Sequence, residues 1–126
     1  MEPVFEVRSA MLVSGTYVVS VTGEADMYAA SDLEQELSEV LAQGAESVIV
    51  DLDEVGFIDS TALGLLLRFQ PRFRARGGDL VIVSGDRRVR RTFEITGLDR
   101  IFRIEHRIGD ALGGTSRVEP AAPSAA

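Results

Sequence analysis

Three consecutive polar residues, Asp59, Ser60 and Thr61, lie between two strongly apolar segments of the chain. Segment 47–52 is rich in β-branched residues, which is typical of a strand covered on both faces, and segment 62–73 has apolar residues at helical spacing. The hydrophobic period therefore changes across Asp59 and Ser60, which predicts a short loop and then a helix that begins at Ser60. A serine hydroxyl at this position is a candidate helix cap and a candidate nucleophile.

A nucleophilic Ser60 would need a base beside it and a third group that orients the base. The chain contains a single histidine, His106, and has no Gly-x-Ser-x-Gly pattern of a hydrolase elbow. It also contains no cysteine, so thiol catalysis, disulfides and cysteine metal sites are excluded. We therefore expect no enzyme activity, no catalytic residue, no metal and no cofactor.

The helix that follows Ser60 is predicted to be apolar on more than one side. Residues three, four and seven positions beyond Ser60 share its face of the helix, namely Leu63, Gly64 and Leu67. A second set is spaced to face a core, namely Ala62, Leu66, Phe69 and Phe73. The first set is either covered by a neighbouring helix or forms an exposed patch that binds another protein. As the cap, Ser60 would stabilise this helix by roughly 1 kcal/mol.

Asp51 and Asp53 raise another interpretation, because a carboxylate at the end of a buried strand can accept a phosphoryl group in a two-component receiver domain. That family also depends on a lysine and on an acidic pair after its first strand. All thirteen basic residues here are arginine, and no acidic pair stands at the expected place. The receiver interpretation is therefore rejected.

The remaining elements alternate between strands and helices. Strands are predicted over 4–13 and 16–22 around a Ser14-Gly15 turn, and both form an edge hairpin. An amphipathic helix follows, with Asp26 and Ser31 as alternative caps. Later come a strand over 79–84, a short helix between the cap Asp86 and the terminating Gly97, and a strand over 101–104.

Four arginines lie on that short helix: Arg87, Arg88, Arg90 and Arg91. Such a concentration of charge is either a solvated helix face or a surface that docks an acidic partner.

Length and composition predict one domain over residues 1–112. From Gly113 the chain is dominated by Gly, Ser, Pro and Ala, so we expect a disordered tail over 113–126. The net charge of −7 argues against a nucleic-acid-binding protein. No apolar run approaches the roughly 20 residues of a membrane span, and the acidic N-terminus does not resemble a signal peptide. We expect a cytoplasmic protein without direct membrane insertion.

The residues at 59–64 read Asp-Ser-Thr-Ala-Leu-Gly. This motif resembles the phosphorylation-site motif of the anti-sigma factor antagonists, the bacterial branch of the STAS domain family. The similarity continues through 76–83 and 89–98 and reaches back to 23–26, so it covers roughly residues 4–105. The resemblance implies an α/β fold of STAS type: a mixed sheet of four to five strands, an N-terminal β-hairpin, and three to four helices mainly on one face.

The resemblance also implies a regulatory circuit. The unphosphorylated protein would bind an anti-sigma factor with a histidine-kinase-like ATPase fold and so release a sigma factor. That partner would phosphorylate Ser60, or Thr61 as the second choice, and a serine phosphatase would reverse the modification. The implied partner contacts are Gly23, Glu24, Asp26, Asp59, Ser60, Thr61, Leu63, Gly64 and Leu67.

Two other roles are open within the same family. Soluble STAS domains also serve in stress-sensing assemblies and as subunits of membrane lipid or anion transport systems. The intact Asp59-Ser60-Thr61 motif favours the phosphorylation switch over both.

Overall fold

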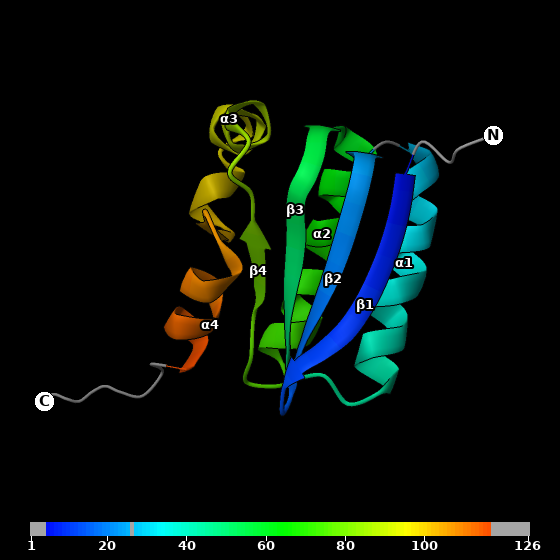
Figure 1. The fold of residues 1–126 in the computed structure, drawn as a ribbon, viewed down its shortest axis with the longest axis vertical. Coiled ribbons are helices and arrows are strands. Elements are labelled where there is room, and N and C mark those ends of the chain that lie inside the picture. Colours follow the sequence, from blue (N-terminus) through cyan, green and yellow to red (C-terminus); the bar gives the residue numbers. More distant parts are fainter. Residues whose placement is uncertain (1–4, 26, 117–126) are drawn as a thin grey trace, which may run out of the picture.

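The computed structural model describes residues 5–25 and 27–116. In these residues a five-stranded sheet is combined with four α-helices (Figure 1). The elements, in chain order, are β1 (Phe5–Val13), β2 (Thr16–Ala25), α1 (Met27–Ala42), β3 (Ser47–Ile58), α2 (Ser60–Arg74), β4 (Leu80–Val83), α3 (Arg87–Thr96), a 3-10 turn (Leu98–Arg100), β5 (Arg103–Glu105) and α4 (Ile108–Ser116).

The strands follow the order β1-β2-β3-β4-β5 across the sheet. β1 and β2 are antiparallel, whereas every other neighbouring pair is parallel. The predicted edge hairpin is confirmed, and Gly15 adopts a φ of 81° in its turn, a conformation that glycine accepts without steric penalty. Because β2, β3 and β4 are parallel, their carboxyl ends meet at one edge of the sheet, where α2 and α3 begin (Figure 1).

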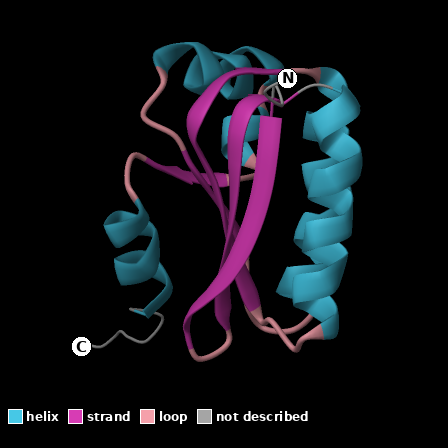
Figure 2. Ribbon diagram, turned by 45° about the vertical axis from the view of Figure 1, so that its right-hand side comes forward, coloured by secondary structure: helices cyan, strands magenta, loops and turns pink. Residues whose placement is uncertain are grey.

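Helices cover the two faces of the sheet unequally. α1 and α2 pack on one face, over a core that includes Leu37, Leu66 and Phe73, all with fully buried side chains. α4 lies on the other face, where Ala111 packs against Ile49 of β3 and its neighbours (Figure 2). The expected mixed α/β sheet with helices mainly on one face is confirmed.

β3 is longer than the sequence predicts. A strand was expected over 47–52 and a loop after it, but the strand continues to Ile58 and Asp59 follows directly. The loop prediction is wrong because β2 also continues, so that Gly23 pairs with Val55 and Ala25 with Ile58. The exposed acidic residues near the middle of β3 are typical of a turn, and only the neighbouring strand extends the ladder past them.

Other boundaries differ by a few residues. α1 begins at Met27, so Ser31 lies in its second turn and is not its cap, while Asp26 falls outside the described residues. β5 lies at Arg103–Glu105, two residues later than predicted at its start. α4 extends to Ser116, beyond the expected end of the domain at residue 112, and residues 117–126 fall outside the described part.

Candidate functional site

The polar motif lies at the junction of β3 and α2. Asp59 has an extended backbone with φ −105° and ψ 179°, and its carboxylate Oδ1 accepts a hydrogen bond of 3.0 Å from the backbone N–H of Ala62. Asp59 is therefore the N-cap, and the prediction that Ser60 caps the helix is wrong. Ser60 is already the first helical residue, because the strand ends one residue before the cap and leaves Asp59 at the change of direction.

The hydroxyl of Ser60 is left free by this arrangement. Ser60 and Thr61 are both exposed, and neither side chain makes a hydrogen bond to another residue within the described ranges. Their backbone N–H groups, at the first two positions of the helix, have no intrahelical acceptor. Together with the helix dipole, these N–H groups make this end of α2 favourable for an anion attached to either hydroxyl.

The end of β2 lies beside this motif. Gly23 pairs with Val55, and Ala25 pairs with Ile58, the residue before Asp59. The structure thus brings Gly23 and the exposed Glu24 to the same edge as Ser60 and Thr61, as the resemblance implied. The third residue predicted there, Asp26, lies outside the described part of the chain.

The predicted contact face of α2 is narrower than expected. Leu63 is only 6% exposed and belongs to the main core, so its side chain offers little surface to a partner. Gly64 and Leu67 are partly exposed. Part of the helix face that carries Ser60 is therefore buried in the core. The sheet and α1 cover more of α2 than a single apolar stripe would require.

An exposed aromatic residue at this edge was not found from the sequence. Phe57 is the second-to-last residue of β3, two positions before Asp59, and is 49% exposed. It lines a shallow, open depression together with Glu24, Gly56, Arg88 and Thr92. No sequence signal identified Phe57, because an apolar residue in a β-rich segment is typical of a core position.

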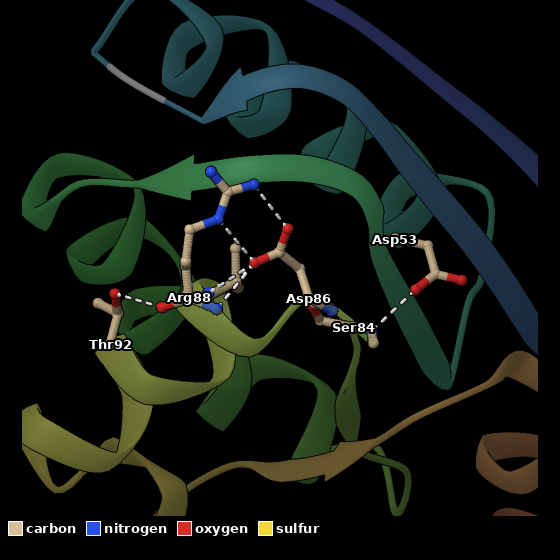
Figure 3. Close-up of polar contacts among 7 residues, drawn as sticks. Asp53, Ser84, Asp86, Arg88 and Thr92 are labelled. Atoms are coloured by element: carbon tan, nitrogen blue, oxygen red, sulfur yellow. Dashed lines mark hydrogen bonds and ion pairs between the residues drawn. The ribbon is translucent and has the colours of Figure 1, made fainter.

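Arg88 is held against this depression by the cap of α3. The Asp86 carboxylate accepts hydrogen bonds from the Arg88 backbone N–H (2.8 Å) and from its guanidinium Nε (3.2 Å) and Nη2 (2.9 Å) (Figure 3). The Arg88 side-chain hydrogen bond lowers the pKa of Asp86 to about 2. Asp53 joins β3 to the same loop, since its Oδ1 accepts a 2.9 Å hydrogen bond from the Gly85 N–H. Asp86 and Gly97, predicted as the ends of this helix, are confirmed as its caps.

The capping role of Asp59 has a direct test. Asp59→Ala is expected to lower the free energy of unfolding by about 1 kcal/mol, because it leaves the Ala62 N–H without its acceptor. Ser60→Ala is expected to change it by less than about 0.5 kcal/mol, since the exposed hydroxyl stabilises nothing. Urea unfolding of the two variants measures the difference, and a larger loss for Ser60→Ala would return the cap to Ser60.

Asp51, the residue that would accept a phosphoryl group in a receiver domain, is half-buried on β3. Burial raises the pKa of its carboxyl, the hydrogen bond from the Asp53 N–H opposes this, and the charges of Asp53 and Glu54 add to the rise. A carboxyl whose pKa is higher in the folded state than in the unfolded state contributes stability below the unfolded pKa, about 3.9, and loses it as the pH rises through the folded pKa.

Asp51→Asn is therefore expected to raise the urea midpoint at pH 7, because the amide is neutral and keeps the acceptor oxygen for the Asp53 N–H. The gain should shrink as the pH falls from 7 through the raised pKa of Asp51, because the protonated carboxyl no longer carries the charge that burial disfavours. Unfolding curves recorded across this pH range would show it, and an advantage that does not depend on pH would contradict the assignment.

Two kinds of feature are absent from the described residues. No helix there is both long and apolar enough to cross a membrane. No group of three or more histidine, aspartate or glutamate side chains there is arranged to hold a metal ion.

Comparison with known proteins extends this picture. The family model of the STAS domain matches residues 9–111. The anti-sigma-B factor antagonist of Staphylococcus aureus (strain NCTC 8325 / PS 47) is 34% identical over 88 residues, which cover 70% of this chain and 82% of that protein.

Solved structures agree with these matches. The crystal structure of an anti-sigma factor antagonist from Mycobacterium paratuberculosis is 30% identical, with a TM-score of 0.80 over 89% of this chain and 94% of that one. The anti-sigma factor antagonist SpoIIAA in its unphosphorylated form shares the fold, with a TM-score of 0.77, 21% identity and coverage of 91% and 100%. The phosphorylated form of the Bacillus protein SpoIIAA has a TM-score of 0.68, 22% identity and coverage of 90% and 100%.

Proposed function

The chain belongs to the STAS domain family, among its anti-sigma factor antagonists, and from this premise we propose that its unphosphorylated form binds an anti-sigma factor and that phosphorylation of Ser60 ends the binding. The partner is an anti-sigma factor of histidine-kinase-like ATPase fold, which transfers the phosphoryl group from ATP to Ser60. A serine phosphatase restores the free hydroxyl. The chain acts in the cytoplasm as a ligand and a substrate, and not as an enzyme.

The observation that carries this proposal is the free hydroxyl of Ser60 on the first turn of α2. Because Asp59 supplies the cap, modification of Ser60 does not cost the helix a stabilising hydrogen bond. The exposed side chain is open to a kinase, and the N–H groups and dipole of the helix favour an added anion. SpoIIAA, which shares the fold, has solved structures in both its unphosphorylated and phosphorylated forms, which supports a fold that tolerates the phosphate.

The switch acts in the complex. A phosphate adds about −1.5 to −2 charges and three acceptor oxygens next to the carboxylate of Asp59. A partner surface shaped for a neutral hydroxyl would then face repulsion and an unpaired, desolvated charge. Release of the anti-sigma factor follows from this cost at the interface, while the domain stays folded.

The proposed contact surface surrounds Ser60 at the carboxyl edge of the sheet. It comprises Gly23, Glu24, Phe57, Asp59, Ser60, Thr61, Gly64 and Leu67. Phe57 supplies an exposed aromatic side chain of the kind that often contributes most to binding energy, and partly exposed Leu67 extends the apolar contact along α2. Asp26 remains a candidate contact on sequence grounds alone.

Phosphopeptide mapping of the protein from its own cells, together with identification of co-purifying proteins, tests this function. We expect phosphate on Ser60 and a kinase-fold anti-sigma factor bound to the unmodified protein. Ser60→Ala should abolish the phosphate and keep the partner, whereas Thr61→Ala should keep both. Phosphate on Thr61 alone would move the switch by one residue. No phosphate under any growth condition, with a transporter or a large assembly as partner, would refute the proposal.

A further inference from the structure

α3 carries a second exposed surface that the Ser60 site does not use. Successive residues of a helix are about 100° apart, so residues four apart share a face. Arg88 and Thr92 face the depression beside Phe57, while Arg87 and Arg91 face away from it. Val89 and Phe93 are buried between the helix and the sheet and fix its orientation.

The second surface is a basic groove. It is lined by Gly85, Arg87, Arg90, Arg91, Glu94 and His106, and it shares no residue with the depression beside Phe57. Arg87 and Arg91 are exposed, and within residues 5–25 and 27–116 neither makes an ion pair or a hydrogen bond. Arg90 uses one guanidinium nitrogen on the Ser84 carbonyl oxygen at 3.3 Å, which holds its side chain along the groove.

The groove is positively charged, whereas the whole chain is negatively charged. The chain has a formal net charge of −7, yet three arginines and a histidine meet here with a single carboxylate, that of Glu94. The loop that forms one end of the groove is rigidly tied, because the Gly85 N–H donates to Asp53 and the Asp86 carboxylate caps α3. The start of α3 is therefore held in place, Arg90 is bonded to the Ser84 carbonyl oxygen, and the guanidinium groups of Arg87 and Arg91 project from the exposed helix surface.

We infer that this groove is a docking surface for an acidic segment of a second protein, bound independently of the Ser60 face. Its free guanidinium groups suit carboxylates, with which arginine forms paired hydrogen bonds. Ile95, 72% exposed and one turn beyond Arg91, offers an apolar contact that a protein segment can use and a free anion cannot. Nucleic acid is disfavoured as the occupant, because the negative charge of the rest of the chain would repel its phosphates.

The test uses the full chain and a short peptide of alternating glutamate and leucine as the probe. Binding is measured by NMR titration of backbone amides and by calorimetry at two salt concentrations. We expect shifts confined to residues 87–95 and His106, and affinity that falls as salt rises. The double variant Arg87→Gln/Arg91→Gln should bind the peptide at least about fivefold more weakly.

The matched control is Arg8→Gln/Arg68→Gln, which changes the net charge equally at exposed arginines outside the groove. It should bind like the unmodified chain, and so should Ser60→Glu, whatever becomes of the proposed switch. Equal weakening in both double variants, shifts centred on Ser60, or no saturable binding would each overturn the inference. Tighter binding of a single-stranded oligonucleotide in the same groove would overturn the assignment of a protein partner.

Discussion

Protein phosphorylated stoichiometrically on Ser60 is expected to bind the anti-sigma factor more than about a hundredfold less tightly than the unmodified protein, a difference of about 3 kcal/mol. The cost arises because the new dianion and the Asp59 carboxylate must both be desolvated against a surface that fits a hydroxyl. Titration calorimetry of the two forms against the same anti-sigma factor measures it. The melting temperature of the phosphorylated protein alone should be unchanged or slightly raised, because an anion at the start of α2 stabilises the helix.

A matched pair of variants separates local repulsion from general charge. Ser60→Glu places a carboxylate at the site, whereas Ser38→Glu places the same charge on an exposed position near the carboxyl end of α1. The other end of α1 is the one that follows the pairing of β2 with the end of β3. Only Ser60→Glu should weaken binding, by about tenfold or more, since a carboxylate carries less charge than a phosphate. Equal weakening by both would assign the effect to long-range charge. A Ser60 phosphoprotein that unfolds far below the unmodified one would show that the modification acts on the fold.

The fold was predictable where local chemistry and periodicity agree. The Ser14-Gly15 turn, the caps Asp86 and Gly97, and the buried pair Val89 and Phe93 all follow from residue type and spacing. In each case the physical cause lies within a few residues: a positive φ that glycine accepts, a carboxylate within reach of free N–H groups, or an i, i+4 apolar pair.

Predictions failed where a distant segment decides the outcome. The end of β3 depends on β2, whose continuation to Ala25 keeps the strand going to Ile58 despite the exposed acidic pair Asp53 and Glu54. Because of that extension the cap is Asp59 and not Ser60. This shift of one residue leaves the Ser60 hydroxyl without a capping hydrogen bond. Leu63 is buried and Phe57 is exposed for the same kind of reason, because burial is set by which elements surround a residue and not by its hydrophobicity.

Gly78→Ala is expected to lower the free energy of unfolding by roughly 3 kcal/mol, a loss of about 10 °C in the melting temperature. A Cβ on Gly78 would overlap the backbone carbonyl oxygen of Glu46 and the side-chain hydroxyl of Ser47. Neither group can withdraw easily. The Glu46 and Ser47 N–H groups both donate to the Gly15 carbonyl oxygen, at 2.9 and 3.1 Å, and the Ser47 Oγ accepts from the Asp79 N–H at 3.1 Å.

The loss would have a steric cause alone, because Gly78 does not require a positive φ. Gly64→Ala is the matched control: its Cβ meets nothing within 4 Å, and replacing glycine inside α2 should stabilise the helix by about 0.5–1 kcal/mol. Differential scanning calorimetry of the two variants should therefore show shifts of opposite sign. If Gly78→Ala melts at the temperature of the unmodified chain, the turn between α2 and β4 can move away from the start of β3, and the close approach of these backbones does not hold the sheet together at this end.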